Sequence, residues 1–501
     1  MSNAVALDVA LPVLIPLAAG ALSLMAWRSR QLQRGLSVTA MLALLAASAW
    51  LLWRVQDDGI QVMHAGNWPA PWGIVLVADL LGAIMVMLTA ITALATAIYS
   101  LATISRQHEH YGYYPLMHLL VAGVNGAFLT GDIFNLYVWF EVMLVASFAL
   151  LILGGERAQM EGAIKYVTLN LVSSALFLSA IGLLYGLTGT LNMADLAVKL
   201  AAHQDNAMVQ VVAMLFLVAF GIKAGAFPLF FWLPASYHTP RVAVSSLFAG
   251  LLTKVGVYAL FRVFTLIFPL QDTLLQTLLL AMAGATMLVG VLGAAAQFEF
   301  RRILSFHIIS QIGYMLMGLA LYTPLALVGG VFYIIHHIIV KSNLFLVSGL
   351  VYRLQGSYDL KKLGGVWRHH PLVAVLFLIP ALSLAGLPPL SGFFGKFIVI
   401  KAGVEVQHWW LVGVALLVGL LTLYSMTKIW AEVFWKPMPE GATAPVQQRG
   451  GTALMVGTIM ALAALTVLIG VAAEPVYRLA EHTAAQLLDS DAYIRSVLGV
   501  L

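Results

Sequence analysis

The sequence has no cysteine and few charged residues. Its 501 residues include 26 Lys and Arg and 21 Asp and Glu, so 9% of the chain is charged, against about 25% in soluble domains. Without cysteine the chain has no disulfide, thiolate metal site or cysteine nucleophile, and its cysteine content does not indicate the redox state of its compartment. The basic excess of +5 is spread over short segments without a cluster or an arm, so we expect no nucleic-acid partner.

Hydrophobic residues make up 61% of the chain, and the mean hydropathy is +0.95. This composition predicts a membrane protein with many spans. The first apolar segment is followed, not preceded, by its nearest basic residue, Arg28. It therefore lacks the positive region of a signal peptide, and we expect it to be retained as a span.

Fourteen apolar runs approach or exceed the length needed to cross a bilayer, about 18–25 residues. They predict an all-α polytopic membrane protein with about fourteen transmembrane helices. The tail from 474 to 501 mixes charged and apolar residues and is expected to form an amphipathic helix at the interface. The fourteen runs cover residues 4–26, 35–55, 75–103, 114–130, 133–153, 164–188, 207–232, 244–268, 274–297, 303–323, 325–351, 371–401, 409–432 and 452–473.

An even number of spans places both termini on one side of the membrane. With the termini outside, fifteen Lys and Arg lie in cytoplasmic loops and six in outer segments, Arg262 being counted with the outer ones. The positive-inside rule therefore predicts termini on the outer, periplasmic side. These twenty-one residues leave five of the 26 basic residues inside the spans, and all five are lysines.

The five lysines and one glutamate lie inside the apolar runs. An ionisable group at membrane depth costs roughly 2.5–3.5 kcal/mol on insertion scales and is a functional candidate by default. Lysine changes its charge state readily on burial, whereas arginine stays charged. The pattern favours proton handling by these residues: Glu141, Lys223, Lys254, Lys341, Lys396 and Lys428.

Two lysine spacings indicate an internal repeat. Lys223 and Lys396 are 173 residues apart, and Lys254 and Lys428 are 174 apart. Each pair falls in corresponding runs of two five-span units, and because five is odd the second unit enters the membrane from the opposite side. Inverted repeats of this kind are typical of secondary transporters. The expected segments are 1–110 with three helices, 111–270 and 271–437 with one repeat each, and 438–501 with the last span and the tail.

The seventh and twelfth runs carry helix breakers at membrane depth. Proline removes an amide donor and clashes with the preceding turn, so both helices should be interrupted. Freed backbone groups cannot face lipid, and matched breaks in two halves point to a transport site. The alternative is a pair of structural kinks. The breakers are Gly221, Gly225, Pro228 and Pro234 in the seventh run, and Gly386, Pro388, Pro389, Gly392 and Gly395 in the twelfth.

Five segments around these residues resemble the antiporter-like subunits of respiratory complex I and of Mrp-type cation/proton antiporters. The resemblance runs from about residue 75 to 435, and within the family it is strongest to the D-subunit branch of the Mrp antiporters. The segments are FEVMLVASFALL, FGIKAGAFPLFFWLPASYHTP, LLTKVGVYALFR, IIHHIIVKSNLFLVSG and GLPPLSGFFGKF.

The resemblance implies a proton path made of half-channels. Glu141 would pair with Lys223 at the first break. Lys254, together with His336, His337 and Lys341, would form a polar axis along the membrane middle. Lys396 would end this axis at the second break.

Structural alternatives remain for several of these residues. Glu141 and Lys223 could form an ion pair that only locks two helices. His336 and His337 invite a metal site, but no carboxylate or third histidine is near in sequence, and we expect no metal and no cofactor. Lys428 is four residues before Glu432, so it could form an i,i+4 pair near the membrane edge. Asp79 and Asp132 precede helical runs and are expected to be helix caps.

The sequence therefore predicts a proton-translocating subunit of a heteromeric monovalent cation/proton antiporter in a bacterial inner membrane. The expected cation is sodium, and the expected partners are the other Mrp subunits, protons, the cation and the lipid bilayer. One alternative is a proton-pumping subunit of complex I or of a membrane-bound hydrogenase. Another is a stand-alone transporter for a solute, which the linear arrangement of charges disfavours.

Overall fold

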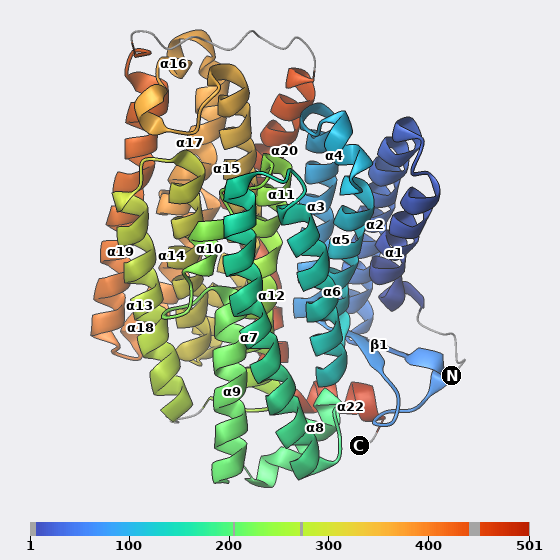
Figure 1. The fold of residues 1–501 in the computed structure, drawn as a ribbon. Coiled ribbons are helices and arrows are strands. Elements are labelled where there is room, and N and C mark those ends of the chain that lie inside the picture. The colour runs from blue at the N-terminus through green and yellow to red at the C-terminus, as the bar shows by residue number, and fades with distance from the viewer. Residues whose placement is uncertain (1–6, 204–205, 271–273, 440–450, 500–501) are drawn as a thin grey trace.

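The computed structural model is a bundle of long, nearly parallel helices (Figure 1), and it describes residues 7–203, 206–270, 274–439 and 451–499. The helices are apolar over most of their length, as the composition requires for a chain that spans a membrane. One short hairpin is the only sheet in the part of the chain that the structure describes.

The N-terminal part consists of three long helices with a hairpin before the third. Strand β1 pairs antiparallel with β2, with Gln61 opposite Ala78. Asp79 begins the third helix as its N-cap and accepts a bond from the Gly82 amide at 2.9 Å, as the sequence predicts. The elements are α1 (Leu7–Met25), α2 (Arg30–Asp58), β1 (Gln61–His64), η1 (Ala65–Asn67), β2 (Val75–Ala78), α3 (Leu80–Thr103) and α4 (Arg106–His110).

The next part of the chain holds five spans, of which the fourth is broken and the fifth contains a π segment. Asp132 caps α6 through the Asn135 amide at 2.8 Å, again as predicted. The elements are α5 (Tyr113–Leu129), α6 (Ile133–Leu151), α7 (Arg157–Thr188), α8 (Met193–Leu200), η2 (Ala201–His203), α9 (Ala207–Ala224), α10 (Trp232–Ser236), α11 (Val242–Leu247), the π segment η3 (Phe248–Leu252) and α12 (Thr253–Leu266).

The following part also contains one broken span and ends in a π segment. It comprises α13 (Leu274–Ala296), α14 (Phe300–Ala320), α15 (Pro324–Gln355), η4 (Leu360–Lys362), α16 (Val366–His369), α17 (Pro371–Ala385), α18 (Ser391–Glu405), α19 (Trp409–Ile429) and the π segment η5 (Trp430–Trp435).

The chain ends with one more span and two amphipathic helices, where the sequence predicts a single amphipathic tail. They are α20 (Thr452–Val471), α21 (Ala473–Leu488) and α22 (Ser490–Leu498). Helix α22 lies at the same end of the bundle as the hairpin (Figure 1).

Twelve helices in the described ranges are long and apolar enough to cross a membrane. The other two predicted spans correspond to α5, with 17 residues, and to the interrupted pair α17 and α18. The architecture is therefore compatible with fourteen spans. Residues 75–78 are not part of the third span, because they form β2; the helix starts at Leu80.

The two broken spans cross the bundle in opposite directions. Figure 1 shows α9 below α10 but α17 above α18, so the chain rises through the first and descends through the second. This is the relation that inverted repeats require. Both breaks begin in the same way: Gly225 and Gly386 have φ of +76° and +93°, the left-handed conformation that suits glycine after a helix end.

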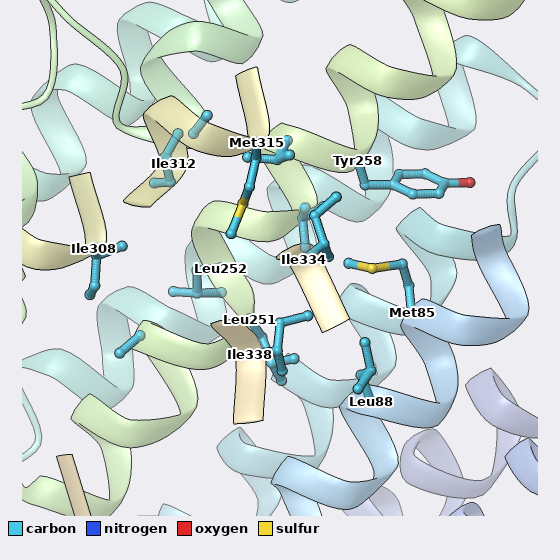
Figure 2. Close-up of a cluster of buried hydrophobic side chains, with 14 of the residues drawn as sticks. Met85, Leu88, Leu251, Leu252, Tyr258, Ile308, Ile312, Met315, Ile334 and Ile338 are labelled. Atoms are coloured by element: carbon cyan, nitrogen blue, oxygen red, sulfur yellow. The ribbon is translucent and has the colours of Figure 1, made fainter. Parts of the chain in front are cut away.

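Three segments form the buried centre of the bundle, namely η3 with α12, α14 and α15. Figure 2 shows how they and α3 share an apolar cluster that includes Met85, Leu252, Met315, Ile334 and Ile338. Polar side chains on these helices are consequently enclosed by protein. Burial of this kind makes each of them either a structural partner or a functional group.

Candidate functional site

Lys223 lies in the last turn of α9, directly before the first break. The helix ends because the amides of Gly225 and Ala226 bond back to carbonyls of Ile222 and Gly221 at 3.0 and 2.9 Å. Farther on, the Phe227 amide donates to Thr286 Oγ1 of α13 at 3.0 Å. The amides of Gly225, Ala226 and Phe227 thus find acceptors inside the protein, which is what membrane depth requires.

The Lys223 amine bonds to helix α7 and not to a carboxylate. Its Nζ donates to the Asn170 carbonyl at 3.4 Å and to Ser174 Oγ at 3.2 Å, and it lies 5.4 Å from the centre of the Phe140 ring. A cavity of about 10 Å³ adjoins it, enough for about one water. The lysine is buried, with 5% of its surface exposed.

Glu141 does not form the predicted ion pair with Lys223. Among the described residues no salt bridge joins the two, and Glu141 Oε1 is a buried atom without a hydrogen-bond partner. The rest of the residue is half-buried on the outer side of α6, on the same stripe as the exposed Val138 and Val145. Val138 lies three residues before Glu141 and Val145 four residues after it, so the three share one face of α6. Neither valine can neutralise the charge of the carboxylate.

Lys254 follows the π segment η3. Its Nζ donates to the carbonyl of Ala249 inside that segment at 2.5 Å, and the lysine is fully buried. The π segment also packs against α15. Ser246, which directly precedes the π segment in α11, donates its hydroxyl to the Ser342 carbonyl of α15 at 3.0 Å. The wider turn therefore supplies the amine with a carbonyl partner that a regular helix would not aim at it.

Helix α15 carries three fully buried basic residues, His336, His337 and Lys341. Lys341 Nζ donates to the Leu304 carbonyl of α14 at 3.1 Å. His336 Nδ1 lies 2.8 Å from Ser391 Oγ at the start of α18, and both ring nitrogens of His337 lack a partner. No cluster in the described ranges has the three or more ligands that would hold a metal ion.

The second break joins His336 to Lys396. Ser391 Oγ is 3.1 Å from Ser383 Oγ, which accepts the Gly392 amide at 3.2 Å. Lys396, in the second turn of α18, donates to the Ala385 carbonyl at 3.2 Å and lies 4.7 Å from the centre of the Tyr314 ring. Its amine therefore bonds to the last residue of the half-helix before the break.

A polar group that sequence reasoning missed extends this region toward α19. His307 Nε2 is 2.9 Å from Ser425 Oγ, and Gln311 bonds to Tyr333 and to Thr422, the latter at 3.4 Å. The signal was present, since His307 and Gln311 are four residues apart on one face of α14. They connect α14, α15 and α19 next to the lysine on α18.

Two predicted residues, Lys428 and Pro234, have other positions than expected. Lys428 donates to the carbonyls of Ala295 and Gln297, each at 2.7 Å, and so caps the end of α13; Glu432 pairs with Lys436 instead. Pro234 lies within the short helix α10 and not in the break, because a first helical turn needs no amide donor. Pro228, Pro388 and Pro389 do lie in the breaks.

Gly392 and Gly395 are helical residues of α18, so the second break covers only residues 386–390. Several residues in the breaks are exposed on the surface of this chain: Phe227, Pro228, Leu387, Pro388 and Pro389.

One buried ion pair involves an arginine expected in an outer segment. Arg262 lies in α12, and its Nη2 is 2.5 Å from Asp79 Oδ2, with both side chains at most 5% exposed. The guanidinium also lies 5.1 Å from the centre of the Tyr493 ring of α22. The carboxylate of Asp79, 183 residues away in sequence, offsets the cost of burying the charge of Arg262.

Two histidines, His108 and His238, lie near Arg241, Arg301 and Arg302, and both have lowered pKa values. Burial lowers the pKa of His238, with help from Arg301 and Arg302, to about 4. Burial and the nearby Arg241 lower the pKa of His108. Both rings are therefore neutral at neutral pH and add no charge to this end of the bundle.

Comparison with known proteins supplies the family. The family model described as NADH:quinone oxidoreductase/Mrp antiporter, TM, matches residues 130–422. A Na(+)/H(+) antiporter subunit of the D type from Alkalihalophilus pseudofirmus is 49% identical over 493 residues, which cover 98% of this chain and 99% of that protein.

Two solved structures have the same fold over nearly the whole chain. A chain of the Mrp complex from Dietzia sp. DQ12-45-1b matches with a TM-score of 0.90 and 34% identity, covering 99% of this chain and 100% of that one. A chain of the membrane-bound sulfane sulfur reductase, an archaeal respiratory membrane complex, matches with a TM-score of 0.88 and 26% identity, covering 99% and 100%.

Proposed function

This chain belongs to the NADH:quinone oxidoreductase/Mrp antiporter family and is a subunit of a monovalent cation/proton antiporter; we propose that it carries the proton route. The proposed route runs through Lys223, Lys254, Lys341 and Lys396. His336 and His337 lie between the last two of these lysines along the packed helices.

The observation that carries the proposal is a row of buried amines without counter-ions. Each of the four amines donates to a backbone carbonyl, and Lys223 also donates to a hydroxyl. None of the four has a carboxylate within ion-pair distance in the described parts of the chain. A proton on such an amine is not held by a fixed partner and can pass to a neighbouring base when one comes within reach.

The helices that bear these amines contact one another in order. Helix α9 packs against α12, η3 packs against α15, and α15 packs against α18. His337, whose ring nitrogens have no partner, lies four residues from Lys341 on one face of α15. Buried waters bridge unsatisfied polar groups in such places, and here they would link the imidazole to the amines.

We propose that Glu141 lies at the entrance of the proton route, at a contact with a neighbouring subunit. A partly exposed glutamate cannot face lipid at this depth without a large cost, and exposed backbone breaks cannot face lipid either. The edge that bears Glu141 and the breaks at Pro228 and Pro389 are therefore expected to be covered by other subunits or by water.

We further propose the orientation with both termini on the periplasmic side of a bacterial inner membrane. The arginine-rich loops support it by the positive-inside rule. Sodium is the cation named for the relative that is 49% identical, and we propose the same exchange here. A redox-driven pump is less well supported, because the respiratory-complex chain matches at 26% identity.

The test is exchange by the complete complex in membrane vesicles, with a pH-sensitive dye that reports sodium-dependent proton movement. Replacing Lys223, Lys254, Lys341 or Lys396 with methionine keeps the length of the side chain and removes the proton carrier. Each variant is expected to lose exchange while the complex still assembles. The matched control is Lys401→Met on α18, where the lysine is exposed and pairs with Glu405. Exchange at the control rate by any of the four variants removes that lysine from the route.

A further inference from the structure

His307 of α14 is a fully buried histidine that the proposed proton route does not use. Its Nε2 lies 2.9 Å from Ser425 Oγ of α19, and its Nδ1 is a buried atom without a hydrogen-bond partner. Buried polar atoms without a partner are rare in folded proteins, and each one indicates strain, a bound water or a functional role. The position of this ring between two lysines favours a function.

On one side, His307 adjoins the centre of the row of buried amines. Lys341 Nζ donates to the Leu304 carbonyl at 3.1 Å, and Leu304 is three residues before His307 on α14. Helical side chains lean toward the N-terminal end of their helix, so the His307 ring leans over the turn that holds this carbonyl. Lys341 and Lys396 both act electrostatically on His307, which places the ring among the charges of the row.

On the other side, His307 adjoins a polar edge of the chain near the ends of α13 and α19. Ser425, its partner, is three residues before Lys428, so these two side chains lie on neighbouring turns of α19. Lys428 Nζ donates to the Gln297 carbonyl, just past the end of α13, at 2.7 Å. The next residue, Phe298, is 46% exposed, so this edge lies at the surface of the chain.

Neighbouring bonds hold the histidine in this position. Gln311, one turn after His307, donates to Thr422 Oγ1 of α19 at 3.4 Å and accepts a bond from the Tyr333 hydroxyl of α15. The Tyr333 ring in turn lies 5.3 Å from the ring of His336. These contacts fix α14 against both neighbouring helices, so the imidazole has a defined place beside Ser425.

We propose that His307 is a further proton-carrying residue, on a branch that joins Lys341 to the edge of the chain at Lys428. This inference rests on the proton route proposed above. With its hydrogen on Nε2, the neutral ring can bind an arriving proton on Nδ1 and pass the Nε2 proton to Ser425 Oγ, whose own proton then leaves toward the edge. The reverse sequence carries a proton inward. Only protons move, and the Lys428 amine stays on its carbonyls.

The experiment measures exchange by the complete complex in membrane vesicles with a pH-sensitive dye. His307→Gln keeps a hydrogen-bonding side chain but cannot carry a proton, and Ser425→Ala removes the hydroxyl that receives one. The maximal rate of each variant should fall at least about tenfold, while the sodium concentration that gives half the maximal rate stays at the wild-type value. Ser425→Thr, which keeps the hydroxyl, should restore most of the rate.

The matched controls are His482→Gln and Thr427→Ala, which change exposed residues on α21 and α19 and should exchange at the wild-type rate. Wild-type rates for His307→Gln and Ser425→Ala, in a complex whose Lys341→Met variant is inactive, overturn the branch and leave the route standing. A lower unfolding temperature with an unchanged maximal rate assigns the contact to helix packing alone and also overturns the branch. Normal exchange by Lys341→Met, by contrast, removes the route on which the branch depends.

Discussion

Lys223 and Lys396 lie on opposite sides of the breaks in their helices. Lys223 is in the last turn of the half-helix before its break, whereas Lys396 is in the second turn of the half-helix after its break. The breaks themselves match, Gly225 with Gly386. The spacing of 173 residues that joins the two lysines in sequence therefore marks corresponding spans but not equivalent positions.

Lys396→Arg is expected to keep the fold and block proton passage. Arginine stays protonated at any accessible pH, so it can supply the charge but cannot release the proton. Sodium-dependent proton movement in vesicles should fall at least about tenfold. Lys401→Arg, an exposed change on the same helix, should exchange normally. Wild-type rates for Lys396→Arg would mean that this position is only a fixed charge.

Glu141→Gln is expected to abolish exchange although Glu141 makes no ion pair with any residue that the structure describes. The amide keeps the shape of the side chain but cannot carry the negative charge that stabilises a proton arriving on Lys223. The complex should still assemble, as blue native electrophoresis can show. Glu161→Gln, an exposed change on α7, is the control. Normal exchange by Glu141→Gln would remove the carboxylate from the route.

Ser391→Ala tests the link between His336 and the second break. The hydroxyl lies within hydrogen-bond distance of His336 Nδ1 and of Ser383 Oγ, and its loss leaves the imidazole without that partner. Exchange should slow roughly threefold to tenfold, while the free energy of unfolding changes by about 1 kcal/mol. Ser179→Ala on the exposed face of α7 is the control. An unchanged exchange rate would show that the hydroxyl only packs the break.

Lys428→Arg should behave differently from Lys396→Arg. Lys428 caps two carbonyls at the end of α13, and a guanidinium can donate to both. Arginine should therefore support exchange close to the wild-type rate, whereas Lys428→Met should lower stability by roughly 1–3 kcal/mol. Exchange and thermal unfolding are measured together. If Lys428→Arg exchanges as poorly as Lys396→Arg, Lys428 belongs to the proton route after all.

His238 should make the protein less stable in acid. Its pKa in the folded chain is lowered to about 4, while an unfolded histidine titrates near pH 6.5. Between these values the unfolded chain binds a proton that the folded chain does not, so stability falls as the pH drops through this window.

His238→Gln should reduce that acid sensitivity by on the order of 1–2 kcal/mol. Thermal unfolding between about pH 7 and pH 4.5 measures it, with the exposed His482→Gln as the control. Identical pH profiles for wild type and His238→Gln would contradict the assignment.

The spans could be predicted from sequence because membrane depth demands long apolar helices with few charges. The breaks at Pro228 and at Pro388–Pro389 were also predictable, since proline and glycine act on the backbone directly. Strand β2 was missed because Val75–Ala78 is as apolar as the helix that follows it, and only its pairing with β1 separates the two.

The partners of the buried charges could not be predicted in the same way. Asp79 and Arg262 are 183 residues apart, and nothing local in either segment indicates the other. Lys254 bonds to a carbonyl of a π segment whose sequence, FAGLL, contains no proline and does not indicate a wider turn. The resemblance implied that Glu141 pairs with Lys223, but the Lys223 amine donates to a carbonyl and a hydroxyl of α7 instead.

The contact between Arg262 and Tyr493 has a consequence for biogenesis. The ribosome makes the helix that bears Arg262 long before α22, and Gln486 of α21 accepts the amide of Leu80 at the start of α3 at 2.7 Å. Helices inserted early in synthesis thus receive some of their neighbours from helices that are made much later. A chain that lacks α21 and α22 would leave the Arg262–Asp79 pair without the Tyr493 ring and the Leu80 amide without Gln486, so the early helices reach their final packing only after these later helices have been made.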